Sequence, residues 1–333
     1  MKILVTGSTG FVGSHICKAL LAQGERVVAF HRASSTLRML DGLDVEHAIG
    51  DLTQPETLQA ALQGVDVVFH AAAMLGDRDE PGRMFAVTVE GTRSLMQAAR
   101  SAGVSRVIHT SSVAALGVPE GSFLKPPVLS LMDEQHTWNY RPEYWPYGYT
   151  KYLAELEVQR AVARGLDAVI VNPSVVLGPG DVYRQSNSII VQIANKKLPG
   201  VVNGGLNVVH IQDVVAGHLA AWKRGRRGAR YILGGDNLHH VEFVEQVAAV
   251  AGVQAPKIVF SPQLLRRVVP VLKIAKSFMN SPFAADMLYL TGYYFFYDIR
   301  KAQKELGLSE PRSSENAIRD AYDWFREMGA LAS

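Results

Sequence analysis

The chain of 333 residues contains only one cysteine, no long uncharged apolar run and no large excess of charge of either sign. The single Cys17 excludes an internal disulfide and favours a reducing compartment, so we expect a cytoplasmic protein. Because about 18 consecutive uncharged apolar residues are lacking, the sequence predicts no transmembrane segment. A formal net charge of +3 is too small to indicate binding to nucleic acid. Apolar content of 48% and charged content of 20% are ordinary for a soluble globular enzyme.

Histidines and basic residues show no pattern typical of a metal or nucleic-acid site. His239 and His240 are adjacent and cannot share a helix face, so we predict no metal site. We interpret the one local basic cluster, formed by Lys223, Arg224, Arg226, Arg227 and Arg230, as a solvated loop before a strand over 230–233. The apolar segment 263–280 carries interspersed basic residues, and we favour a helix of the substrate-binding lobe over a helix on a membrane surface.

Short apolar runs alternate with helical patterns through the first half of the chain. This alternation predicts an α/β fold, a Rossmann-type doubly wound parallel sheet with a smaller C-terminal substrate-binding lobe. We assign residues 1–172 to the dinucleotide-binding domain and 173–333 mainly to the lobe, and expect segments near 207–235 to return to the first domain. The predicted strands are 2–6, 26–30, 45–49, 65–71, 106–111 and 168–172, and the predicted helices include 87–101, 147–164 and 315–328, the last with Ser314 as N-cap.

A glycine-rich turn separates the first strand from the first helix and reads Gly7-Ser8-Thr9-Gly10-Phe11-Val12-Gly13. Gly7 allows a tight turn, Gly10 lets the backbone approach a pyrophosphate, and Gly13 lets the helix pack close to the strand. The helix N-terminus supplies free amides for the phosphates. An ordinary turn is the alternative, but the position between strand and helix favours nucleotide binding.

Tyr147 and Lys151 are spaced to lie on one face of a helix that begins with Pro146. An ammonium group near a phenol favours the phenolate and lowers the tyrosine pKa. Such a tyrosine can give a proton to a carbonyl oxygen, or take one from an alcohol, near neutral pH. A surface Tyr and Lys with no such role is the alternative for this spacing alone.

Hydroxyl residues follow the fifth predicted strand, in the order Thr110-Ser111-Ser112. The carboxyl ends of parallel strands are where ligands bind in sheets of this kind. A serine there can donate a hydrogen bond to a substrate carbonyl, although it could equally satisfy local backbone groups.

With these three features in order, the chain resembles the extended short-chain dehydrogenases/reductases of the NAD-dependent epimerase/dehydratase superfamily, most closely the dihydroflavonol-4-reductase-like branch. The resemblance covers nearly the whole chain. It also includes Gly50-Asp51-Leu52, Asp66-x-x-x-His70-Ala71-Ala72-Ala73, Asn172-Pro173-Ser174-Val175-Val176-x-Gly178-Pro179 and His210-Ile211-Gln212-Asp213-Val214.

The resemblance implies roles for these positions. Tyr147 is the expected general acid/base, Lys151 the residue that holds the nicotinamide ribose and tunes Tyr147, and Ser112 the catalytic serine, with Ser111 as the alternate. Asp51 and Leu52 are expected to flank the adenine. The other expected cofactor contacts come from the glycine turn (Gly7, Thr9, Gly10, Phe11, Val12, Gly13), Ala71, Ala72, Ala73, Pro173, Ser174, Val175 and Val176.

One departure from the family pattern falls in Val87-Thr88-Val89-Glu90-Gly91-Thr92, where Thr88 takes the place of a common Asn. In related enzymes that Asn helps to order a water relay behind the lysine. Thr88 can also hold a water, but the expected proton path changes.

Cofactor preference is predicted from the end of the second strand, Ala29-Phe30-His31-Arg32-Ala33-Ser34-Ser35. An acidic residue there would bind the ribose 2′-hydroxyl of NAD, and none is present. The Arg32 guanidinium could instead pair with a 2′-phosphate, assisted by Ser34, Ser35 and Arg38. We therefore favour NADP(H) over NAD(H).

The leading hypothesis is an NADP(H)-dependent reductase or dehydrogenase acting on a small-molecule carbonyl or alcohol. Its substrate is expected to be partly hydrophobic, with Met74, Leu75, Leu116, Tyr183 and the segment after Phe260 as candidate lining residues. One alternative is an NAD-dependent nucleotide-sugar epimerase or dehydratase, for which Arg184, Lys196, Lys197 and the cluster 223–230 could bind a diphosphate. Another alternative is a non-catalytic nucleotide-sensing protein. A homodimer through helices 87–101 and 147–164 is also expected.

Overall fold

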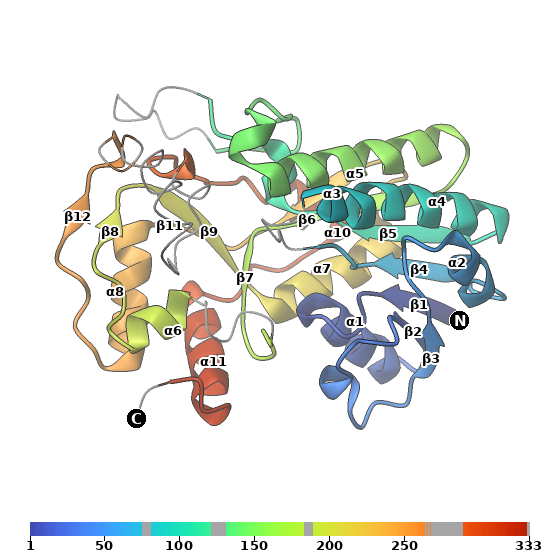
Figure 1. Cartoon of the computed structure of the whole chain (residues 1–333), viewed down its shortest axis with the longest axis horizontal. Coiled ribbons are helices and arrows are strands. Elements are labelled where there is room, and N and C mark those ends of the chain that lie inside the picture. Colours follow the sequence, from blue (N-terminus) through green and yellow to red (C-terminus); the bar gives the residue numbers. More distant parts are fainter. Residues whose placement is uncertain are drawn as a thin grey trace.

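The computed structural model describes residues 1–74, 81–120, 131–182, 189–263, 265, 267 and 289–331. A seven-stranded parallel sheet forms its centre, in the order β10-β6-β5-β4-β1-β2-β3 (Figure 1). The strands are β1 (Lys2–Thr6), β2 (Arg26–His31), β3 (Glu46–Ile49), β4 (Val67–His70), β5 (Arg106–Thr110), β6 (Ala168–Pro173) and β10 (Arg230–Leu233). The predicted doubly wound parallel sheet is confirmed.

Both faces of the sheet are covered, which is why its strands are apolar at consecutive positions. In β1, Ile3 and Val5 pack into one core, and Leu4 packs into the other. The first core is closed by α1 (Phe11–Ala22), α7 (Ile211–Arg224) and α10 (Arg300–Leu306). The second is closed by α2 (Pro55–Ala61), α4 (Gly91–Ser101) and α5 (Pro146–Ala163).

The predicted helix over 87–101 is not uniform. After α3 (Pro81–Phe85), residues Ala86–Glu90 form a π-helical segment, η2, and only then does α4 begin. Such segments are rare and occur often at functional sites. Thr88 lies within it and is 1% exposed.

A second, smaller region contains most of the chain after β6. A three-stranded sheet joins β7 (Val175–Leu177), β9 (Gly205–His210) and β11 (Asp236–His239), and β8 (Val201–Val202) pairs with β12 (Val259–Phe260). A third apolar core lies between this sheet and the helices α6 (Ile189–Ala194), α8 (His240–Ala251) and α11 (Ser314–Glu327). Ser313, not Ser314, is the N-cap of α11, because its backbone is extended and its side chain accepts from the Asn316 amide.

Of the segments expected to return to the first domain, β10 pairs with β6 in the central sheet, whereas β9 belongs to the three-stranded sheet. The chain thus passes between the two regions more than once, and the division at residue 172 stays a prediction. Among the described residues, no helix is long and apolar enough to cross a membrane.

Candidate active site

Parallel pairing brings the carboxyl ends of β1, β4, β5 and β6 to one edge of the sheet, because Thr6 lies beside His70, His70 beside His109, and Thr110 beside Val171. The predicted site segments follow these strands directly. They are the glycine turn, 71–74, 111–112 and 174–176. The topology therefore places the predicted cofactor and reaction residues along a single edge.

The glycine turn has the tight geometry predicted for it. Gly7 has φ of +66°, and a Cβ on it would lie 2.7 Å from the Ala72 backbone nitrogen. A Cβ on Gly13 would lie 2.1 Å from the Gly7 carbonyl oxygen, so only glycine fits there. Gly10 is the N-cap of α1 and has no side chain to occupy the first-turn amides. These features fit a pyrophosphate at the helix N-terminus.

A buried network that the sequence did not reveal supports this turn. Thr6 Oγ1 lies 2.7 Å from His70 Nδ1, and His70 Nε2 lies 3.0 Å from Thr92 Oγ1. Thr92 donates its hydroxyl hydrogen to the Thr88 carbonyl at 2.6 Å, so it accepts from His70 Nε2–H, and His70 Nδ1 accepts from Thr6. Burial lowers the pKa of His70 to about 3, which keeps the ring neutral. Thr6 in turn accepts from the Ala72 amide at 3.2 Å, which fixes the segment beside Gly7.

The Thr88 hydroxyl forms a hydrogen bond with the backbone. Its Oγ1 accepts a hydrogen bond from the Met74 amide at 3.2 Å. The residue at the family's Asn position therefore holds the segment that follows β4. Any role of Thr88 in a proton relay stays a prediction.

Lys151 is buried at the predicted position, one helical turn after Tyr147. Its side chain donates from Nζ to the Thr110 carbonyl oxygen at 2.8 Å, and the residue is 2% exposed. Burial lowers the pKa of Lys151 to about 8, and the nearby Glu155 carboxylate opposes that shift. Tyr147 lies in the first turn of α5 and is half-buried.

Ser112 is the N-cap of η3 (Val113–Leu116), the short 3₁₀ helix after β5. Its Oγ accepts from the Ala114 amide at 3.2 Å, which does not use the hydroxyl's own hydrogen. Gly148 permits α5 to pack directly on this turn, since a Cβ there would lie 2.8 Å from the Ala114 carbonyl. The Tyr147 and Ser112 elements are thus in direct contact. Ser111, the alternate, is 5% exposed, and its Oγ has no partner among the described residues.

The residues expected near the adenine and its ribose differ in exposure, from the exposed Arg32 and Arg38 to the buried Leu52. Arg32 and Arg38 are exposed beyond the end of β2, and Arg38 Nη2 lies 3.2 Å from Met328 Sδ. One carboxylate oxygen of Asp51 accepts from the Thr53 amide and hydroxyl. Leu52 is 5% exposed and packs against the start of α4, where Gly91 leaves room.

Residues expected at the nicotinamide and substrate end are only partly described. Pro173 is buried at the end of β6, Val175 is exposed, and the buried Ser174 Oγ has no partner among the described residues. Leu116 does not line an open surface, because it is wholly buried in an apolar cluster with Met132 and Tyr297. Leu75, Tyr183, Arg184 and nearly all of 264–288 lie outside the described residues.

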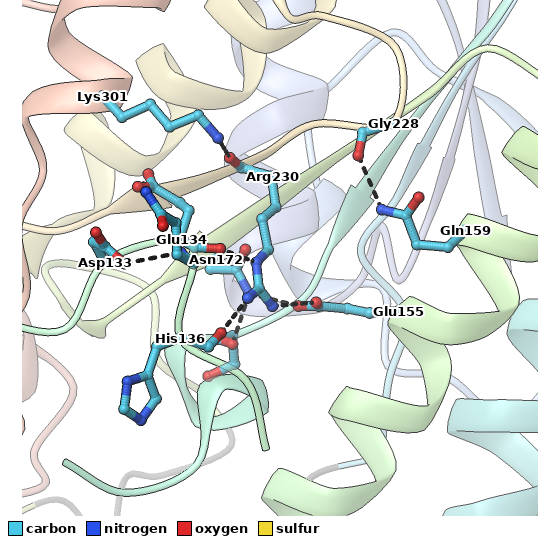
Figure 2. Close-up of polar contacts among 11 residues, drawn as sticks. Asp133, Glu134, His136, Glu155, Gln159, Asn172, Gly228, Arg230 and Lys301 are labelled. Atoms are coloured by element: carbon cyan, nitrogen blue, oxygen red, sulfur yellow. Dashed lines mark hydrogen bonds and ion pairs between the residues drawn. The ribbon is translucent and has the colours of Figure 1, made fainter. Parts of the chain in front are cut away.

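The strand predicted over 230–233 is confirmed, but the loop predicted before it is wrong for Lys223 and Arg224, which end α7. The expected solvation is also wrong for the Arg230 side chain, which is mostly buried. Arg230 begins β10, and its side chain is only 17% exposed because it forms an ion pair with Glu155 on α5 (Figure 2). A cavity of about 530 Å³ lies beside this pair, lined by residues that include Glu134, Tyr152, Gln159 and Lys301. It adjoins the edge strand β10 and not the glycine turn. In the parts of the chain that the structure describes, no cluster of three or more His, Cys, Asp or Glu side chains could hold a metal ion.

Comparison with known proteins gives a consistent result. The family model described as the NAD dependent epimerase/dehydratase family matches residues 3–234. Sterol demethylase protein B from Methylococcus capsulatus is 37% identical over 99% of this chain and 100% of its own length. A Synechocystis protein provisionally named a dihydroflavonol 4-reductase is 36% identical over 98% of this chain and 94% of its own. The crystal structure of gox2253 superposes with a TM-score of 0.85 at 37% identity, covering 99% of both chains.

Proposed function

Because the chain belongs to the NAD dependent epimerase/dehydratase family, as an extended short-chain dehydrogenase/reductase, we propose that it is an NADP(H)-dependent reductase that converts a ketone or aldehyde to an alcohol, or the reverse. The family and its relatives named as reductases and hydroxysteroid dehydrogenases make it an oxidoreductase that uses a nicotinamide cofactor. The proposal that it reduces a carbonyl rests on the buried Lys151, which lies one helical turn beyond Tyr147 and beside the end of β5.

The proposed chemistry divides between cofactor and chain. A nicotinamide held at this edge of the sheet would supply the hydride that is added to the carbonyl carbon. Ser112 donates a hydrogen bond from Oγ to the carbonyl oxygen, which withdraws charge from the carbon. Tyr147 gives its phenolic proton to the same oxygen as the alcohol forms. The Lys151 ammonium stabilises the tyrosinate that remains, until solvent returns the proton.

The preference for NADP(H) is also a proposal. Arg32 is exposed at the end of β2, free to extend toward a 2′-phosphate, and no carboxylate occurs between Ala29 and Ser35 to bind a 2′-hydroxyl. Titration with NADPH and with NADH tests this, and tighter binding of NADH would refute it.

The substrate is proposed to be a small, partly hydrophobic carbonyl compound, in line with relatives named for sterol, dihydroflavonol and cinnamoyl-CoA chemistry. A screen of ketones, aldehydes and alcohols, followed by nicotinamide absorbance with each cofactor, tests the reaction. If no compound of any of these classes is turned over, the proposal fails.

An epimerase is the second candidate, because a nucleoside-diphosphate-sugar epimerase from Pseudomonas aeruginosa superposes with a TM-score of 0.82 at 27% identity. Lys196 and Lys197 are exposed after α6 and available to a diphosphate. An epimerase would retain NAD through purification and show no net redox change. Release of NAD from the denatured protein would therefore favour this candidate.

A homodimer through α4 and α5 is also proposed. The two helices pack side by side, and Arg93 of α4 pairs with Glu157 of α5 at 3.1 Å. Light scattering during gel filtration measures the mass in solution, and a monomer would contradict this assembly.

A further inference from the structure

Asn172, next to last in β6, joins the Ser112 turn to helix α5. Its amide nitrogen donates to the Ser112 carbonyl oxygen at 2.9 Å and to Glu155 Oε1 at 2.6 Å. Both partners are acceptors, so the nitrogen of the amide must face them. Asn172 is wholly buried, and the Glu155 side chain is 6% exposed. Solvent therefore does not compete for these bonds.

Glu155 uses its second carboxylate oxygen on Arg230, whose Nη1 lies 3.1 Å from Oε2. The same guanidinium donates through Nε to the Glu134 carbonyl at 2.8 Å and through Nη2 to the His136 carbonyl (Figure 2). Arg230 thus contacts the segment 131–145, which leads through η4 (Pro142–Tyr144) into α5 and Tyr147.

Arg230 is itself held at the edge of the sheet. Its carbonyl oxygen accepts from Lys301 Nζ at 2.7 Å, and the Ile232 amide donates to Glu134 Oε1 at 2.9 Å. As an edge strand, β10 has backbone groups on the side opposite β6 that no other strand can pair with. The side chains of Lys301 and Glu134 form hydrogen bonds with two of these groups. The backbone that carries the Arg230 guanidinium is therefore fixed in position.

We propose that Glu155 and Arg230 are positioning residues of the reductase site, which hold the Ser112 backbone through Asn172 and the segment before Tyr147 through the Arg230 fork. This inference rests on the function proposed for Ser112 and Tyr147. A carboxylate is required at 155, because it must accept from an amide and from a guanidinium at once. A glutamine would present its own NH₂ group to one of the two donors.

The test is Glu155→Gln, with Glu157→Gln as the matched control. Glu157 lies on the same helix, its side chain is equally buried at 6%, and it pairs with Arg93 and Arg160 instead. We expect E155Q to lower kcat at least about tenfold, since small misplacement of reacting groups is costly, with KM and the Kd for NADPH changed less than about twofold. E157Q should change kcat less than about twofold. A kcat for E155Q equal to that of the control would overturn the proposal.

A double variant tests the path through Asn172. Because Glu155 acts on Ser112 through Asn172, N172A/E155Q should lose less kcat than the product of the two single losses, with any loss beyond that of N172A coming from the Arg230 path, whereas independent effects would multiply. Multiplied losses would overturn the proposal. If E155Q does not fold, Arg230→Lys replaces it, because it keeps the charge and loses the fork; unchanged kcat there would overturn the proposal equally. Failure of the proposed function differs from these outcomes, because the wild-type protein would then reduce no carbonyl at all.

Discussion

Replacing Lys151 by methionine should make the protein more stable and inactive at the same time. The folded state lowers the pKa of Lys151 from 10.5 to about 8, and burial is the main cause. At pH 7 the ammonium is protonated in both states, so the whole difference between the two pKa values opposes folding, by roughly 3 kcal/mol. Methionine removes this cost and fills a similar volume. It also leaves the Thr110 carbonyl without its Lys151 donor, which costs about 1–3 kcal/mol. We expect a net gain of up to about 2 kcal/mol.

The sign of the pH dependence separates this cause from better packing. Because the folded-state pKa of Lys151 is depressed, its destabilising effect is complete below about pH 8 and disappears as the pH rises toward the unfolded value of 10.5. Urea unfolding of both proteins at pH 7 and pH 10 measures the difference. At pH 10 the cost that methionine removes is below about 1 kcal/mol, so the gain of K151M should disappear or turn into a loss, while turnover is lost at both pH values. A gain that is the same at both pH values, or a loss of stability at pH 7, would refute this reasoning.

Three further changes have definite expected outcomes. Tyr147→Phe should reduce turnover by roughly 100-fold or more, while the Kd for NADPH from fluorescence titration stays nearly constant; surviving turnover would contradict the acid/base role. Gly13→Ala should destabilise the fold by about 1–3 kcal/mol and weaken NADPH binding, because its Cβ would meet the Gly7 carbonyl, whereas Gly82→Ala, with open space around it, should change neither; calorimetry and titration would show equal effects if the turn were unimportant. Arg32→Ala should weaken NADPH binding roughly 10- to 100-fold and leave NADH binding unchanged, as measured by titration, and an equal loss for both cofactors would contradict 2′-phosphate recognition.

The central sheet could be predicted from the sequence because the residues of each strand indicate whether one or both of its faces are covered. A run such as Ile3-Leu4-Val5 is apolar at every position only where both faces of a strand are covered. The glycine turn was equally accessible, since Gly7 and Gly13 are required by contacts within a few residues or by a positive φ. The buried strands and the glycine turn depend mainly on the conformation and burial of a few consecutive residues, so short sequence patterns predict them.

The π-helical segment Ala86–Glu90 was not predictable in the same way. Three of its five residues are β-branched, but nothing in the pattern predicts a wider turn, which coincides with tertiary hydrogen bonds from Met74 to Thr88 and from His70 to Thr92. Thr88 accepts from Met74, and its carbonyl accepts from Thr92, which also contacts His70. A helix predicted over 87–101 is right in kind and wrong at its beginning for this reason.

The burial of the Arg230 side chain and its ion pair with Glu155 could not be predicted from the sequence pattern. The sequence predicts that Arg230 begins a strand, but nothing local indicates that its side chain is mostly buried against Glu155 while Arg226 and Arg227 are exposed. What distinguishes it is the parallel register of β10 on β6, which pairs Arg230 with Ile170 and Ile232 with Asn172. Side chains alternate between faces of a strand, so a shift of one residue would turn the guanidinium to the opposite face of the sheet from Glu155. The ion pair therefore depends on the register of two strands that lie far apart in the sequence, and so would any positioning of Ser112 that depends on it.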